Sequence, residues 1–299
     1  MKLVILGANG QVGYELQRSL LPLGEVIALD RAQADLTQLE KLKQTLIDLK
    51  PDVIVNAAAY TVVDKAEEEP ELAMLINGEA PGVIAEAAKQ LDALLIHYST
   101  DYVFNGAKTE PYTEEDTPNP INVYGRTKLA GEQAIKNIGG NYLILRTSWV
   151  YSKHGNNFLK TILRLSKERE ELSIVADQFG VPNWARNVAD ATSHVIVKIQ
   201  HKRNNNNFTS ALYHFSARGK TTWYGFASAI IERTKLIDTI GNLKIEKVLP
   251  ITTDEYPLPA PRPKYSQLDS SLISTRFGVR LPEWHDVMEL CIDEFIELQ

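Results

Sequence analysis

Two side chains that can move a proton together stand one helical turn apart in the middle of the chain. Tyr124 and Lys128 are separated by three residues, a spacing that places a phenol and an ammonium group on one face of a helix. A free tyrosine has a pKa of about 10, and a nearby cation lowers it by stabilising the phenolate. The pair is therefore a candidate proton donor, although this spacing also arises by chance on helix surfaces.

A hydroxyl group at the end of an expected strand can act with this pair. The apolar run at 94–96 leads into Ser99, Thr100 and Asp101, and the carboxyl edge of a parallel sheet is where open α/β folds bind ligands. We expect Thr100 to join Tyr124 in polarising a carbonyl group, with Ser99 as the alternative hydroxyl. Asp101 is expected to fix the loop or to orient a bound ligand.

A glycine-rich loop follows the first apolar run, 3–6, and opens an amphipathic segment. Here Gly7 permits a tight turn, Gly10 lets a phosphate approach the backbone, and Gly13 lets the helix pack closely on the strand. The free N–H groups at the start of the helix would then meet the pyrophosphate of a dinucleotide. The segment predicts a cofactor site formed by Gly7, Asn9, Gly10, Gln11, Val12 and Gly13.

Residues after the second and third expected strands extend this site. Asp30 lies about twenty residues beyond the loop, where a carboxylate accepts hydrogen bonds from the adenosine ribose and favours NAD. Arg31 can instead pair with the 2′-phosphate of NADP. NADH and NADPH therefore both stay open. Further cofactor contacts are expected from Asp35, Leu36, Ala57, Ala58 and Ala59.

The apolar runs are continuous, not alternating, which is typical of strands buried on both faces of a parallel sheet. They lie at 3–6, 26–29, 53–55, 94–96 and 143–145. Amphipathic patterns between them predict helices at 12–23, 39–49, 82–91 and 124–138. The expected fold class is α/β, with a Rossmann-type doubly wound parallel sheet.

The regular alternation stops after Tyr151, where helical patterns at 158–169, 188–201 and 223–234 are interrupted by short strand candidates. We expect an NAD(P)-binding domain over 1–150 and a smaller, mixed α/β substrate domain over 151–299. Segments around 172–200 are candidates to return to the first domain. The segment 250–263, rich in proline, is expected to be extended and to close over part of the molecule.

Composition excludes several classes of function. The chain has 38 acidic and 32 basic residues and a net charge of −6, the wrong sign for a surface that binds nucleic acid. The first apolar run is too short for a signal peptide or a membrane span. The single cysteine, Cys291, cannot form an internal disulfide. The histidines are scattered, and no H-E-x-x-H occurs. We expect a cytoplasmic protein without a metal, nucleic-acid or membrane partner.

Longer segments make the chain resemble one family nearly from end to end. The glycine loop and the Tyr-x-x-x-Lys pair are shared by a whole superfamily, whereas the runs at 99–104, 146–151 and 262–269 are more specific. Together they are similar to the extended short-chain dehydrogenase/reductases and, within these, to the dTDP-4-dehydrorhamnose reductases. That resemblance implies reduction by NADPH or NADH of the C4 ketone of a small-molecule substrate, dTDP-4-dehydro-β-L-rhamnose.

The resemblance also implies roles for individual residues. Thr100, Tyr124 and Lys128 would be catalytic, with Tyr124 protonating the C4 oxygen as hydride arrives. Arg262 would pair with the diphosphate, a role that suits a guanidinium group. The substrate contacts implied in this way are Val63, Thr100, Asp101, Tyr102, Trp149, Asn157, Phe158 and Arg262.

Two alternatives come with the resemblance. Sugar-nucleotide 4,6-dehydratases carry Asp-Glu directly after the threonine, whereas Tyr102 follows Asp101 here, so simple reduction is favoured over elimination. A regulatory subunit of methionine adenosyltransferase is also a relative, and it binds NADP without comparable turnover. The complete set of Thr100, Tyr124 and Lys128 argues against that second role.

The resemblance bears on assembly as well. Some relatives dimerise around Mg²⁺ held by interface glutamates, and Glu15 fits one such position. Arg186 and His285 stand at the counterparts of the others, and they would repel a cation. We therefore expect a monomer or a homodimer without a bridging metal.

Overall fold

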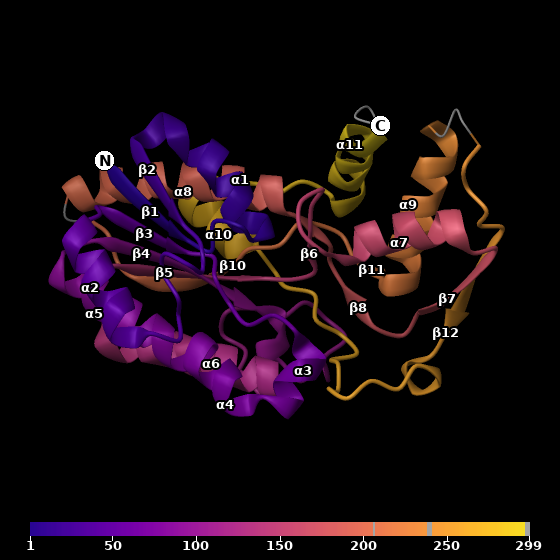
Figure 1. Cartoon of the computed structure of the whole chain (residues 1–299), viewed down its shortest axis with the longest axis horizontal. Coiled ribbons are helices and arrows are strands. Elements are labelled where there is room, and N and C mark those ends of the chain that lie inside the picture. Colours follow the sequence, from indigo (N-terminus) through magenta and orange to yellow (C-terminus); the bar gives the residue numbers. More distant parts are fainter. Residues whose placement is uncertain (206, 238–240, 297–299) are drawn as a thin grey trace.

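The computed structural model describes residues 1–205, 207–237 and 241–296 and arranges them in two lobes (Figure 1). One lobe holds a large sheet with helices on both faces. The other is built from α7, α9 and α11 with short strands. None of the described helices combines the length and the hydropathy needed to cross a membrane.

The described residues form one main sheet of six parallel strands, in the order β10-β5-β4-β3-β1-β2. The five predicted strands are confirmed, and β10 is an addition that the sequence reading missed. The strand order reverses between β1 and β3, which makes their carboxyl ends a topological switch point where such sheets bind ligands. The strands are β1 (Lys2–Leu6), β2 (Glu25–Leu29), β3 (Val53–Asn56), β4 (Leu94–Thr100), β5 (Tyr142–Thr147) and β10 (Ala211–His214).

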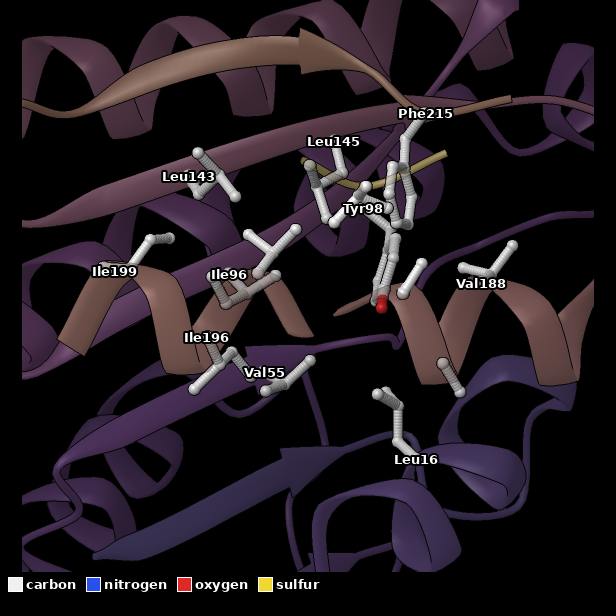
Figure 2. Close-up of a cluster of buried hydrophobic side chains, with 14 of the residues drawn as sticks. Leu16, Val55, Ile96, Tyr98, Leu143, Leu145, Val188, Ile196, Ile199 and Phe215 are labelled. Carbon is white, nitrogen blue, oxygen red and sulfur yellow. The ribbon is translucent and has the colours of Figure 1, made fainter. Parts of the chain in front are cut away.

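Helices cover the main sheet on both faces because successive strand side chains point to opposite sides. On one face, Leu16 of α1 and Val188 and Ile196 of α8 pack against Val55 and Ile96 (Figure 2). On the other face, α2, α5 and α6 bury their apolar side chains against alternate residues of the same strands. The helices are α1 (Gln11–Leu20), α2 (Leu39–Leu49), α5 (Ala80–Gln90), α6 (Val123–Ile138) and α8 (Ala185–Asn204).

The second lobe has a core of its own, formed by α7 (Phe158–Glu168), α9 (Trp223–Ile237) and α11 (Trp284–Ile296). Beside it, β7 (Glu171–Val175) pairs in parallel with β12 (Lys247–Ile251). Short pairs join β6 (Val150–Tyr151) to β9 (Asn183–Trp184), and β8 (Phe179–Gly180) to β11 (Thr221–Thr222).

Short helical segments connect the longer helices and strands. The helices α3 (Val63–Glu68) and α4 (Pro70–Met74) follow β3, and α10 (Ser271–Phe277) precedes α11. A π-helical stretch occupies Leu75–Glu79. In the part of the chain that the structure describes, 3₁₀ segments lie at Leu21–Leu23, Asp101–Val103 and Thr253–Glu255.

The segment 172–200 divides between the two lobes. Its strand, β7, pairs with β12 and does not join the main sheet, whereas its helix, α8, packs on α1 over the main sheet. The later strand β10 also lies in the main sheet, beside β5. The domain boundary near residue 150 stays a prediction.

The helix that carries Tyr124 and Lys128 lies unusually close to its neighbours. A Cβ atom at Gly131 would overlap the carbonyl oxygen of Asn77 in the π-helical stretch. At Gly125 it would overlap the carbonyl oxygen of Tyr102. The backbone of α6 is therefore held by close contacts with other backbone segments on two sides.

We predict that Gly131→Ala lowers the free energy of unfolding by about 1–3 kcal/mol, because the added methyl group must push two backbones apart. Gly82→Ala in α5 is the matched control, since its Cβ would meet the Ala134 methyl group at 3.3 Å, with no backbone in the way. Urea denaturation of the two variants measures the difference. Equal stabilities would show that α6 moves away freely.

Candidate active site

The glycine loop has the geometry of a phosphate cradle. Gly7 has φ +85°, and a Cβ atom there would lie 2.8 Å from the Ala58 nitrogen at the end of β3. A Cβ atom at Gly13 would overlap the Gly7 carbonyl oxygen, whereas one at Gly10 would meet only that oxygen, at 3.2 Å. No side chain caps the start of α1. The first N–H groups of this helix are thus open to an anion at the switch point.

Gln11 joins this loop to the second lobe. Its Nε2 donates to the Val150 carbonyl oxygen at 3.2 Å. Its Oε1 accepts from Asn157 Nδ2 at 2.8 Å and from Ser152 Oγ at 3.3 Å. The Tyr14 ring in α1 also stacks on His154, with centroids 4.0 Å apart. These contacts hold the glycine loop and the start of α1 against residues 150–157.

Asp30 and Arg31 present the two opposite cofactor signals. Asp30 Oδ1 accepts from the Ala32 N–H at 2.9 Å, and Asn9 Nδ2 lies 3.3 Å from Oδ2. Arg31 is 79% exposed and touches Asp35 at 3.7 Å. Leu36 is buried in the core, among residues of β1, β2 and α2. The cofactor contacts of Asp35, Leu36 and Ala57–Ala59 stay predictions.

Thr100 and Tyr124 come together from β4 and α6. Thr100 is the last residue of β4, and its Oγ1 accepts from the Tyr102 N–H at 3.1 Å. Tyr124 lies in the first turn of α6, which Asn122 caps by accepting from the Gly125 N–H at 2.7 Å. Burial raises the pKa of Tyr124 to about 12, against a smaller lowering by hydrogen bonding with Thr100. Tyr124 is thus a neutral phenol that holds a proton beside a second hydroxyl.

Lys128 is buried, with only 2% of the residue exposed. Its Nζ donates to the Tyr98 carbonyl oxygen at 2.6 Å and stands 3.4 Å from His97 Nε2. Burial lowers the pKa of Lys128 to about 8, while Glu132 acts in the opposite sense. The predicted lowering of the Tyr124 pKa by Lys128 is wrong in this arrangement, since burial dominates and raises it.

Ser99, the alternative hydroxyl, forms a hydrogen bond with one member of a buried ion pair. Its Oγ donates to Glu132 Oε1 at 2.6 Å. Glu132 also accepts from Arg146 Nε at 2.8 Å and Nη2 at 2.6 Å, and both side chains are at most 2% exposed. The sequence analysis did not predict this pair. A usable signal was a glutamate inside the predicted helix 124–138 and an arginine directly after the predicted strand 143–145. The structure therefore leaves Thr100 as the hydroxyl beside Tyr124.

Asp101 and Tyr102 complete the edge of the sheet. Asp101 Oδ1 accepts from Thr100 Oγ1 at 3.1 Å. Burial raises the pKa of Asp101 to about 6, although hydrogen bonds to its carboxyl group lower it in part. The Tyr102 ring meets Tyr124 edge to face, with centroids 5.6 Å apart. Asp101 thus fixes the Thr100 hydroxyl.

Arg262 binds a carboxylate of the protein itself. Its Nη1 and Nη2 donate to Asp64 Oδ1 and Oδ2, each at 2.6 Å, and Nη1 also donates to the Ala260 carbonyl oxygen. Asp64 follows Val63 at the start of α3. The pair clips the residues before Arg262 over α3. The predicted extended segment 250–263 closes over the molecule here, but it is not extended throughout, because β12 runs to Ile251 and a 3₁₀ turn occupies Thr253–Glu255. A contact between Arg262 and a diphosphate stays a prediction.

The predicted pocket residues Trp149 and Phe158 belong to an aromatic group. Trp149 has φ +43° and stacks on Trp223, with ring centroids 3.6 Å apart. A Cβ atom at Gly180 would lie 2.6 Å from the Trp149 ring, so only glycine fits there. Phe158 packs on Trp223 at 4.7 Å. Asn157, expected to contact a nucleotide, caps α7 by accepting from the Lys160 N–H at 3.0 Å.

Glu15, the one residue that fitted a bridging metal position, is held by cations. Arg186 Nε lies 3.3 Å from its carboxylate, and Arg18 Nε lies 3.5 Å away. Within the described ranges no three His, Cys, Asp or Glu side chains gather as metal ligands. A dimer and its metal content stay predictions.

Comparison with known proteins decides the family. The family described as "RmlD substrate binding domain" matches residues 1–297. The chain belongs to this family. It is 48% identical over 296 residues to a dTDP-4-dehydrorhamnose reductase from Burkholderia thailandensis, covering 99% of each chain. The expected doubly wound α/β fold and the family resemblance are confirmed.

Two crystal structures are similar over nearly the whole chain. A dTDP-4-dehydrorhamnose reductase from Clostridium acetobutylicum has a TM-score of 0.89 at 38% identity, covering 99% of this chain and 100% of its own. One from Bacillus anthracis, in complex with NADP, has a TM-score of 0.88 at 38% identity, covering 98% and 99%.

We predict that Glu132→Leu lowers the free energy of unfolding by about 3–5 kcal/mol, because it leaves the buried Arg146 guanidinium without a partner. The double variant Glu132→Leu/Arg146→Met should recover much of the loss, since no buried charge remains. Denaturant titration compares the three proteins. A single variant within about 1 kcal/mol of the parent would contradict a buried pair.

Proposed function

We propose that the protein reduces the C4 ketone of dTDP-4-dehydro-β-L-rhamnose with NADPH or NADH and so forms dTDP-L-rhamnose. The observation that carries this proposal is the meeting of two hydroxyl groups, Thr100 and Tyr124, at the same carboxyl edge of the sheet that carries the glycine loop. Relatives that match along the full length are named for the same reaction.

The two hydroxyl groups act on one oxygen atom. When the ketone binds, the Thr100 O–H would turn from Asp101 to the C4 carbonyl oxygen and donate to it together with the Tyr124 phenol. The two hydrogen bonds would polarise the ketone and stabilise the charge that develops on its oxygen. Reduced nicotinamide, when bound, supplies the hydride to C4. Tyr124 then gives its proton to the oxygen, so ketone, hydride and proton together make the C4 alcohol. The phenol suits this task because its raised pKa keeps it protonated at neutral pH.

The dinucleotide would be held by the loop and by the end of β2. The open N–H groups of α1 fit its pyrophosphate, and Gly10 leaves room for close approach. Asp30 Oδ2 would accept from a ribose hydroxyl, and Arg31 is exposed enough to turn toward a 2′-phosphate. Lys128 would contact the nicotinamide ribose.

The substrate would lie between Tyr124 and the second lobe. We assign its sugar to the neighbourhood of Val63, Asp101, Tyr102 and Trp149, its nucleotide to that of Asn157 and Phe158, and its diphosphate to Arg262. We also place the reaction in the cytoplasm, where the single cysteine would stay a thiol.

The decisive assay measures oxidation of NADPH and NADH by the purified protein. The ketone is made in situ by the preceding enzymes of its synthesis, and chromatography identifies the product. Formation of dTDP-L-rhamnose supports the proposal. Cofactor binding without turnover would point to the other reading, a regulatory partner protein that binds NADP.

Tyr124→Phe removes the proton donor and keeps the ring. We expect kcat to fall about a hundredfold or more, while the dissociation constant for NADPH stays nearly unchanged. Steady-state kinetics and NADPH fluorescence measure the two quantities. Unchanged turnover in this variant would remove Tyr124 from its role.

Arg31→Ala separates the two cofactors. Loss of the guanidinium should raise KM for NADPH about tenfold, because one charged contact to the 2′-phosphate is lost, and leave KM for NADH within about twofold. Asp30→Ala is the reciprocal control and should weaken NADH more than NADPH. An unchanged KM for NADPH in Arg31→Ala would show that this residue does not read the 2′-phosphate.

A further inference from the structure

A line of buried polar groups runs behind Lys128, and the proposed reaction does not use it. Asn56 ends β3 and His97 lies in β4, and each is 1% exposed. Asn56 Nδ2 is 3.1 Å from His97 Nδ1, and His97 Nε2 is 3.4 Å from Lys128 Nζ. The line therefore ends on a residue of the candidate active site.

A backbone N–H group sets the direction of hydrogen bonding along this line. The Ala58 N–H donates to Asn56 Oδ1 at 3.1 Å, so the amide nitrogen of Asn56 must face His97. Turning the amide over would place its NH₂ against the Ala58 N–H and satisfy neither group. Asn56 is therefore the donor, and His97 Nδ1 is the acceptor.

The histidine passes this direction on to Lys128. A neutral imidazole carries one N–H group, so accepting at Nδ1 leaves the proton on Nε2. That N–H points toward Lys128 Nζ, which already donates to the Tyr98 carbonyl oxygen. An ammonium group has donors only, whereas a neutral amine has a lone pair. The contact with His97 is thus favourable for the amine and unfavourable for the ammonium form.

We propose that His97, held in its Nε2–H form by Asn56, is a positioning residue that favours the neutral form of Lys128. The structural part of this inference is independent of the reaction. Its kinetic consequence, the pH at which activity falls on the alkaline side, rests on the proposed function.

The charged and titratable groups around Lys128 do not cancel the effect of His97 on its protonation. Glu132 on the next turn of α6 favours the ammonium form, but Arg146 of β5 and Ser99 of β4 bind its carboxylate. Tyr124, one turn earlier on α6, keeps its proton. Burial holds the pKa of His97 well below its usual value, so the imidazole adds no charge.

Nuclear magnetic resonance tests the geometry directly. In protein labelled with ¹⁵N-histidine, we expect His97 to show a protonated Nε2 and an unprotonated Nδ1 from pH 6 to 9. In protein labelled with ¹³C-lysine, Lys128, assigned by its loss in Lys128→Arg, should titrate near pH 8. A protonated Nδ1, or an imidazolium ring in this range, would overturn the proposal.

Two substitutions test the effect on Lys128. His97→Leu removes the opposing N–H group, and Asn56→Asp reverses the line, since a carboxylate accepts from Nδ1–H and frees Nε2 to accept from Lys128. Each should raise the pKa of Lys128 by about one unit or more. An unchanged pKa in both folded variants would show that His97 only fills space. Should His97→Leu fail to fold, Asn56→Asp decides alone.

The double variant Asn56→Asp/His97→Leu separates the tautomer from the new carboxylate charge. We expect Asn56→Asp to add much less to the pKa of Lys128 without His97 than with it. An equal rise in the Lys128 pKa with and without His97 would mean that the new carboxylate charge alone causes it, and this result would contradict the proposal.

Kinetics then connect the effect to the reaction. If turnover is observed, the alkaline fall in kcat should move up by the same number of pH units as the Lys128 titration, whereas a structural defect would lower kcat at every pH. If turnover is absent, the proposed function fails, and the resonance data still decide the role of His97.

Discussion

The buried ion pair between Glu132 and Arg146 is the interaction on which the site's position depends. It joins α6 to β5 in the interior, where an unpaired charge would be very unfavourable. Ser99 adds β4 to the same pair, so helix and strands have one allowed register. Because Tyr124 and Lys128 lie on α6 and Thr100 lies on β4, this register brings the two hydroxyl groups together. The ion pair also directs the Ser99 hydroxyl toward Glu132 and leaves Thr100 as the hydroxyl beside Tyr124.

Much of this fold could be predicted from local patterns. Continuous apolar runs mark β1 to β5, because strands buried on both faces need apolar side chains at every position. The helices α2 and α6 begin and end within a residue of the expected positions. By contrast, the local sequence does not predict β10, since pairing with the neighbouring strand β5 makes this segment a strand. The pairing of β7 with β12 also could not be predicted from local patterns, because the partner strand lies about 75 residues further along the chain.

The site shows the same division between local and distant causes. The glycine loop and Thr100 were visible because each sits at a strand end, a position that sequence reveals. The partners of Arg262 and Lys128 could not be predicted, since Asp64 and His97 lie far from them in the sequence and come close only in the fold. Burial also could not be read from spacing. A lysine one turn from a tyrosine suggested a lowered phenol pKa, yet desolvation of both groups decides their pKa values.

A short series of side-chain contacts joins the glycine loop to the second lobe. Gln11 of the glycine loop accepts from Asn157, and Asn157 caps α7. The next residue, Phe158, packs on Trp223, which in turn stacks on Trp149. A shift of the loop would therefore strain α7 and the aromatic group beside it. Because Asn157 both binds Gln11 and caps α7, the glycine loop and the aromatic group are held in one geometry by the same few contacts.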